Sequence, residues 1–171
     1  MMGSEPALTS IVSTADRPDL FPLVARWLWV AFWGAGGRSL EDTVDAVRRS
    51  VTAAPMPRTF VLLADGRPVG TASLVAHDPD ERPELTPWLA GMFVEPDVRG
   101  RGYAGLLIGA VEAAARHAAI PTLWLYTNAA ERIYARAGWR TVETFPRHGK
   151  VFALMRRDVM PRSEQSEVMS V

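Results

Sequence analysis

A short segment rich in glycine and arginine carries the clearest chemistry in this chain. Arg99-Gly100-Arg101-Gly102 follows an apolar run and precedes a pattern typical of a helix. The first turn of a helix leaves about four backbone N–H groups without internal partners and carries roughly half a positive charge. Glycine lets an anion approach these donors closely, and the two arginines add formal positive charge. The segment therefore predicts a binding site for a pyrophosphate group.

The same glycines permit other interpretations. Gly100, Gly102 and Gly105 also have the spacing of the dinucleotide-binding fingerprint. That fingerprint needs an acidic residue about 20 positions further on, at the end of the next strand, to bind a ribose. Here the next predicted strand, residues 122–127, is followed by Asn128. No Gly-Lys-Ser/Thr sequence follows the glycines, which argues against a P-loop. From this segment alone, a glycine-rich turn that binds nothing remains an alternative.

The overall composition excludes several kinds of site and partner. The chain has 171 residues, of which 48% are hydrophobic, and a formal net charge of +0 at pH 7. We therefore expect one domain with a sizeable core and neither nucleic acid nor a membrane surface as partner. Since cysteine is absent, disulfides, thiolate metal sites and cysteine nucleophiles are excluded. The lack of a long apolar run or a secretion-signal pattern leads us to expect a cytoplasmic protein.

Turn and periodicity signals predict an alternation of strands and helices that would position the glycine segment. Strands are predicted over residues 8–13, 59–64, 68–76, 89–94, 122–127, 141–145 and 151–156, and helices over 103–117 and 129–137. Asp65-Gly66 predicts a tight turn between the second and third strands. Gly138 is expected to end the last helix.

Two further helices are predicted near the N-terminus. We expect Asp19 to cap the first, which runs through Trp33. This helix is apolar nearly all round, so it should contact other elements on most sides. We expect Ser39 to cap the second helix, with Asp42 completing a variant of the capping box.

Two motifs in this order resemble those of the GNAT acyltransferase superfamily. Residues 94–104 read VEPDVRGRGYA, which is similar to the superfamily's acetyl-CoA loop, where Arg or Gln is followed by x-x-Gly-x-Gly/Ala. Residues 134–139 read YARAGW, which is similar to a second signature with a tyrosine four residues before glycine and an aromatic residue. The order of predicted elements also fits, and the resemblance extends from about residue 59 to residue 156.

The resemblance implies an α/β (α+β) fold. Its centre would be a mixed, mostly antiparallel sheet of about six to seven strands, flanked by about four helices and splayed between the fourth and fifth strands. We expect a single domain over residues 1–157 and a disordered tail over residues 158–171.

The resemblance also implies an N-acetyltransferase that moves the acetyl group of acetyl-CoA to a primary amine of a small molecule or peptide, without a metal. The amine would attack the thioester directly in a ternary complex. The residues expected to bind the cosubstrate are Met92, Phe93 and Val94 along the fourth strand, Arg99, Gly100, Arg101, Gly102, Tyr103 and Ala104 at the helix start, and Asn128 after the fifth strand. Backbone N–H groups of the fourth strand would polarise the thioester oxygen.

Tyr134 is the residue that the resemblance marks as general acid, since it would protonate the departing thiolate. From the residues alone, Tyr134 shares one helical stripe with Ala130, Ile133 and Ala137. An ordinary core role is therefore the alternative for this side chain.

The general base is less clearly marked in this sequence. Many members of the superfamily carry a glutamate on the central strand, where this chain has Trp88. Glu84, just upstream, is our prediction for the base or for a group that anchors the acceptor. Asp78, Asp80 and Glu81 in the same loop are predicted to be solvated charges.

One other class of function remains open from the sequence. A coenzyme A-binding sensor or partner-binding domain would keep the pyrophosphate site without turnover. We expect a monomer or a homodimer, because the aromatic first helix fits either state.

Overall fold

The structure is a computed structural model that describes residues 5–52 and 54–160. Its strands are β1 (Thr9–Ser13), β2 (Arg58–Ala64), β3 (Arg67–Val75), β4 (Trp88–Val94), β5 (Thr122–Thr127), β6 (Arg140–Arg147) and β7 (Lys150–Asp158). Its helices are α1 (Phe21–Leu28), α2 (Leu40–Arg48), α3 (Tyr103–His117) and α4 (Glu131–Arg136), with short turns η1 (Pro18–Leu20), η2 (Trp29–Trp33) and η3 (Pro96–Val98). In the ranges described, none of the helices combines the length and apolar character of a membrane span.

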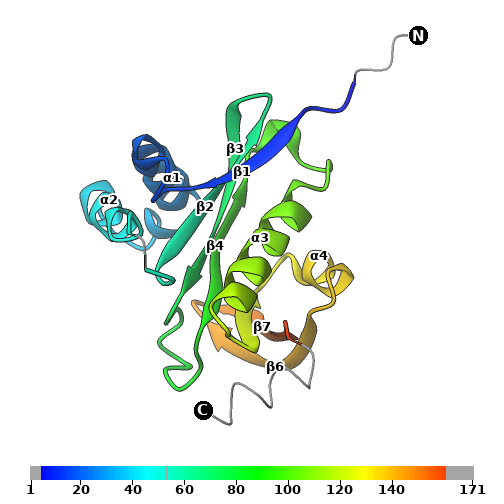
Figure 1. The fold of residues 1–171 in the computed structure, drawn as a ribbon. Helices are drawn as coiled ribbons and strands as arrows, with labels where there is room; N and C mark the ends of the chain where they lie inside the picture. The colour runs from blue at the N-terminus through cyan, green and yellow to red at the C-terminus, as the bar shows by residue number, and fades with distance from the viewer. Residues whose placement is uncertain (1–4, 53, 161–171) are drawn as a thin grey trace.

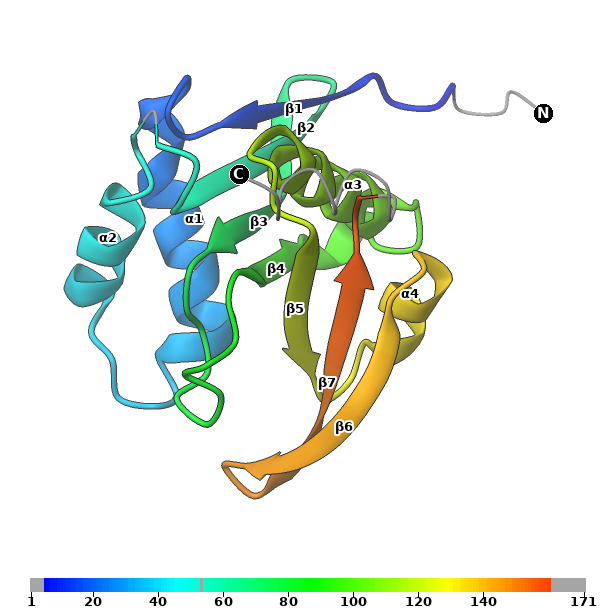
Figure 2. The same cartoon turned by 60° about the horizontal axis from the view of Figure 1, so that its bottom comes forward.

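One seven-stranded sheet organises the molecule, in the order β1-β2-β3-β4-β5-β7-β6 (Figures 1 and 2). All neighbouring strands are antiparallel except β4 and β5, which are parallel and share a single ladder pair, Trp88 with Trp124. Past this pair the two strands diverge. The predicted fold, a mostly antiparallel sheet splayed between the fourth and fifth strands, is confirmed.

Helices cover both faces of the sheet, with α1 and α2 on one side and α3 and α4 on the other (Figure 1). Side chains alternate between these faces along each strand, as strand geometry requires. On β5, Leu123 and Leu125 join the core beneath α3, whereas Trp124 and Tyr126 point to the opposite face. There they pack into a separate aromatic cluster around Trp88, which lies between β4 and the β6–β7 hairpin.

A bulge in β4 interrupts this alternation. The register with β3 passes from Phe93 directly to Ala90, so Gly91 and Met92 together face one residue of β3. Gly91 adopts φ +64°, a conformation that suits glycine. As a result Met92 packs against the α3 core, while Phe93 packs against the α1 core.

Several local predictions are confirmed. Asp65 and Gly66 have φ values of 49° and 79° and form the turn between β2 and β3. The Ser39 hydroxyl oxygen accepts a hydrogen bond from the Asp42 N–H group at 3.0 Å and caps α2. This second helix ends at Arg48.

The predictions for the first helix are partly wrong. Asp19 does not cap it, because its carboxylate forms an ion pair with Arg17 at 2.9 Å, and the N-cap is Leu20. The helix also does not run regularly through Trp33, since its last turn, η2, is π-helical. Val30 and Phe32 in that turn are 71% and 50% exposed. The expectation that this helix contacts other elements on most sides is therefore confirmed for α1 but wrong for η2.

The chain limits of the domain stay a prediction. Strand β7 includes Asp158, one residue beyond the expected domain limit. Residues 161–171, most of the predicted disordered tail, lie outside the described residues.

Candidate active site

The N-terminus of α3 presents a row of backbone donors. Gly102 is the N-cap with φ 83°, and Gly100 has φ 80°, so both adopt the left-handed conformation. No side chain caps this end, and within the described ranges no group accepts a hydrogen bond from the N–H groups of residues 101–104. A Cβ atom at either glycine would meet nothing within 4 Å. These donors are open to an anion the size of a phosphate group.

The residues predicted to bind pyrophosphate thus lie together at one helix end. Arg99 and Arg101 are exposed at its rim. The Arg99 Nε atom donates to the Val94 carbonyl oxygen at 2.9 Å, which turns this side chain back over the end of β4. Tyr103 contributes its backbone, because its side chain is buried in the core.

The bulged strand β4 lies beside this helix end and borders the gap between β4 and β5 that begins past Trp88, which we call the opening. Beyond Trp88 the edge of β4 that faces β5 has no ladder partner. Met92, Phe93 and Val94 therefore lie along an unpaired edge, where the sequence predicted contacts with the cosubstrate. The bulge at Gly91 frees further main-chain groups on the β3 side. The sequence carries a signal for this bulge, since a glycine inside an apolar strand often marks one.

Tyr134 is fixed by the way α4 ends. Gly138 has φ +95°, its N–H group donates to the Ala135 carbonyl oxygen at 3.0 Å, and the Trp139 N–H group donates to the Tyr134 carbonyl oxygen at 3.0 Å. This is the Schellman pattern of helix termination. The Trp139 ring meets the Tyr134 ring edge-on with their centroids 6.2 Å apart. The tyrosine and the Gly-aromatic pair of the motif are therefore parts of one helix cap.

The Tyr134 side chain is buried, with 6% of its surface exposed. Burial raises the pKa of its hydroxyl, so the group is protonated at neutral pH. Within residues 5–52 and 54–160 this hydroxyl forms no hydrogen bond with another protein group. Its ring belongs to the core against which Met92 packs. The Tyr134 hydroxyl is thus a buried, protonated group in the core that Met92 of β4 packs against.

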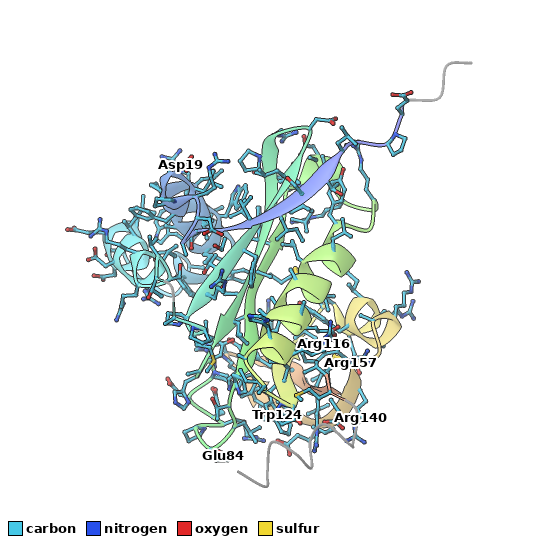
Figure 3. All side chains as sticks on the ribbon, viewed as in Figure 1. Asp19, Glu84, Arg116, Trp124, Arg140 and Arg157 are labelled. Carbon is cyan, nitrogen blue, oxygen red and sulfur yellow. The ribbon has the colours of Figure 1, made fainter. Side chains whose placement is uncertain are left out.

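A polar contact holds α4 against α3. The Trp139 Nε1 atom donates to Glu112 Oε1 at 2.9 Å, and Arg157 of β7 approaches the same carboxylate with its Nε atom at 3.4 Å. Arg157 also donates through Nη1 to the Gly138 carbonyl oxygen at 2.9 Å. A Cβ atom at Gly138 would lie 1.8 Å from this nitrogen, so a larger residue would displace the Arg157 side chain, and the φ of +95° itself favours glycine. Figure 3 shows Arg157 beside α3 at the level of α4.

The two remaining predicted residues lie at the surface. Asn128 is exposed directly after β5. Glu84 is exposed in the β3–β4 loop, and Figure 3 shows it at the outer end of that loop. Among the described residues neither side chain has a hydrogen-bond partner. Their roles stay predictions.

The structure brings together a group of side chains that sequence reasoning did not assign to the site. Asp78 of the β3–β4 loop interacts with the Tyr126 hydroxyl on β5 and with the Arg147 guanidinium at the end of β6. We call the β3–β4 loop (residues 76–87) and the β6–β7 hairpin the acceptor side, because Glu84, the residue predicted to anchor an acceptor, belongs to this loop. The sequence offers no local signal for this cluster, because its members are brought together only by the fold.

Comparison with known proteins fits this geometry. A model of the acetyltransferase (GNAT) family matches residues 23–139, more than half of the chain. The chain belongs to the GNAT acetyltransferase family. It is accordingly an acyltransferase. The match spans both signature motifs and ends at Trp139, so most of the GNAT acceptor side here lies beyond it. No curated protein sequence matches the chain.

Solved GNAT structures share the fold at low sequence identity. A GNAT-family acetyltransferase from Streptococcus pneumoniae is 15% identical, with 90% of this chain and 100% of that chain covered and a TM-score of 0.68. An aminoglycoside 6'-N-acetyltransferase complexed with coenzyme A is 14% identical, with 91% and 98% covered and a TM-score of 0.69. The yncA protein of Salmonella typhimurium, with its cofactor acetyl-CoA, is 13% identical, with 92% and 96% covered and a TM-score of 0.66.

Proposed function

We propose that this protein transfers the acetyl group of acetyl-CoA to the primary amine of a small molecule or peptide, by direct attack in a ternary complex. The observation that supports this most is the juxtaposition of three features: open N–H groups at the start of α3, the bulged edge of β4, and the buried, protonated Tyr134. A similar fold binds coenzyme A in an aminoglycoside acetyltransferase, which favours a small-molecule amine.

The residues present fit the cosubstrate. The N–H groups of residues 101–104 would hold its pyrophosphate, with Arg99 and Arg101 neutralising charge at the rim. Asn128, on the other side of the opening, is our proposal for an additional polar contact. Main-chain N–H groups around Met92 would face the thioester oxygen, where donors stabilise developing negative charge by several kcal/mol.

Tyr134 is proposed as the general acid. The thioester supplies an activated acyl group, and transfer breaks its C–S bond as the C–N bond of the amide forms. The sulfur then needs a proton, which the Tyr134 hydroxyl can give. Since a thiol of pKa about 8.5 leaves readily even as thiolate, we expect this donation to contribute about 10- to 1000-fold.

The test is release of free thiol from acetyl-CoA when a panel of small primary amines is added. Wild-type protein should release thiol with at least one of them. Tyr134→Phe should lower the rate about 10- to 1000-fold with little change in coenzyme A affinity or stability, because the hydroxyl has no hydrogen-bond partner among residues 5–52 and 54–160. If every amine leaves the thioester intact while coenzyme A binds, the proposed function is wrong.

A further inference from the structure

The β3–β4 loop is held in place over the aromatic cluster by two ion pairs. Arg82 donates to Glu143 of β6 at 2.5 Å, and Arg147 donates to Glu81 at 2.7 Å. Both arginines also lie over aromatic rings, with Arg82 5.1 Å from the Phe145 centroid. The exposed fractions of the Arg147 and Glu81 side chains are 21% and 35%, so this pair is partly withdrawn from water. The loop is therefore tied to the hairpin at two points.

This attachment brings the loop that carries Asp78 beside Tyr126 of β5, because Arg147 binds Glu81 and also lies over the Tyr126 ring, 5.1 Å from its centroid. Its neighbour Tyr126 lies two residues beyond Trp124, the last residue of β5 that pairs with β4. By that register, Tyr126 is level with Ala90 of β4, immediately before the bulge. Trp88 and Tyr126 meet edge-on with centroids 6.2 Å apart, which fixes the tyrosine ring on the face opposite α3. Asp78, which interacts with the Tyr126 hydroxyl, thus belongs to the side of the sheet away from Tyr134.

Among the described residues, no cation forms an ion pair with Asp78 alone. Tyr126 from β5 and Arg147 from the hairpin act on it, and Arg147 is already bound to Glu81 of the same loop. In the described part of the chain, α1 and η2 place no charged group against it. Crowding by protein atoms raises the pKa of Asp78 to about 7, although the residue keeps solvent access. The Arg147 guanidinium and the Tyr126 hydroxyl act in the opposite direction and keep the pKa from rising further.

We propose that Asp78, held between Tyr126 and Arg147 by the tethered loop, binds the ammonium group of the acceptor and accepts its proton. This inference rests on the proposed function and replaces Glu84 as the base. A carboxylate on the face opposite the general acid leaves the acceptor nitrogen between the two groups. Proton acceptors work best with a pKa near the working pH.

The proton balance of the step is complete. The ammonium gives one proton to the Asp78 carboxylate, and the freed lone pair attacks the thioester carbon. The C–S bond then breaks, and the sulfur takes the proton of Tyr134. The nitrogen loses its second proton as the amide forms, which restores Tyr134 directly or through water. Asp78 returns its proton to solvent, so each turnover releases one proton.

The first experiment measures kcat/KM for thiol release over pH 6 to 10 with one alkylamine acceptor. Asp78→Asn should lower kcat/KM about 100-fold or more at pH 7. The deficit should narrow at high pH, where the amine loses its proton in solution without help. Coenzyme A affinity should stay within about 2-fold of wild type, because Asp78 lies away from α3. The matched control is Asp80→Asn, an exposed acid of the same loop that should leave kcat/KM unchanged.

The second experiment keeps Asp78 and changes its neighbours. Tyr126→Phe and Arg147→Gln each remove a group that lowers the pKa of Asp78. The acidic limb of kcat/KM should therefore move to higher pH in both variants, relative to wild type with the same acceptor. Asp78→Glu should restore part of the activity lost in Asp78→Asn, which a purely structural role does not predict.

Each outcome separates this inference from the function on which it rests. A wild-type protein that releases no thiol contradicts the proposed function. An active wild type with an equally active Asp78→Asn variant overturns only the role of Asp78. Loss of activity in Glu84→Gln with Asp78→Asn intact would assign the base to Glu84 and overturn the inference in the same way.

Discussion

The two sides of the opening are built in different ways. The proposed cosubstrate side consists of helix ends, where glycine conformation and main-chain N–H groups form the candidate site within short stretches of sequence. The acceptor side consists of side chains from a loop and a hairpin, joined by ion pairs between residues 61 and 66 positions apart. Main-chain geometry suits a ligand common to a whole family, whereas side-chain contacts can change with the acceptor. The predictions below test this difference.

Glu112→Ala should have the largest effect on the free energy of unfolding. The contact that it removes lies on the cosubstrate side. The variant leaves Trp139 Nε1 and the Arg157 guanidinium without their shared carboxylate. Losing one partner of a largely buried contact costs about 3 kcal/mol, or about 6–12 °C in Tm for a chain of this size. Thermal unfolding measures this directly. Glu112→Gln keeps an acceptor for Trp139 and should lose much less, and equal losses in both variants would contradict the contact's role.

Gly102→Val should weaken coenzyme A binding about 30-fold. A β-branched residue at φ 83° costs about 2 kcal/mol in that conformation, so the main chain should move and the donors with it. Calorimetric titration with coenzyme A measures the loss. Gly109→Ala is the control, because this exposed glycine of the same helix has open space at its Cβ. Unchanged affinity in Gly102→Val would show that the helix end does not bind the cosubstrate.

Asp78→Asn should stabilise the protein at alkaline pH while it removes activity. The folded pKa of about 7 lies above the ordinary value of 3.8, so the folded state holds the proton more tightly. Wild type therefore loses stability as pH rises between these values, and asparagine escapes that loss. With allowance for solvent screening of an exposed group, the gain is about 1 kcal/mol at pH 8. Chemical unfolding at pH 8 and pH 4 checks this, since the difference should vanish at the lower pH.

Arg82→Gln should have the smallest effect, and we expect it to change only acceptor binding. Exposed ion pairs contribute about 0.2–1 kcal/mol, so stability should hardly change. The loop should become less firmly placed, which we expect to raise KM for the acceptor about 2- to 5-fold with coenzyme A affinity unaltered. A double-mutant cycle with Glu143→Gln measures the coupling. An equal rise in the coenzyme A dissociation constant would contradict the separation of the two sides.

The sequence-based predictions were accurate where local sequence determines the conformation and failed where distant side chains meet. The start of α3 and the cap after Tyr134 were predictable because local glycines determine their conformation. The Asp65-Gly66 turn was predictable for the same reason. The site itself is inferred from these elements and awaits the experiments above.

Contacts between groups far apart in the sequence, or between groups that compete for one partner, could not be predicted from local sequence. Asp19 satisfied the rule for a helix cap, but Arg17, two residues before it, binds its carboxylate instead. Asp78 resembled any solvated loop charge, because its partners Tyr126 and Arg147 belong to other strands and meet it only in the folded chain.

The single pair that joins Trp88 to Trp124 has a consequence for the protein without its substrate. Past that point the facing edges of β4 and β5 carry backbone N–H and C=O groups without ladder partners. Unpaired strand edges of this kind can pair with strands of other molecules and so promote aggregation. In the proposed function, the amide-bearing arm of coenzyme A would occupy this gap. Bound coenzyme A would then also protect the protein from aggregation. Protein freed of coenzyme A should therefore precipitate at a lower temperature than protein that retains it.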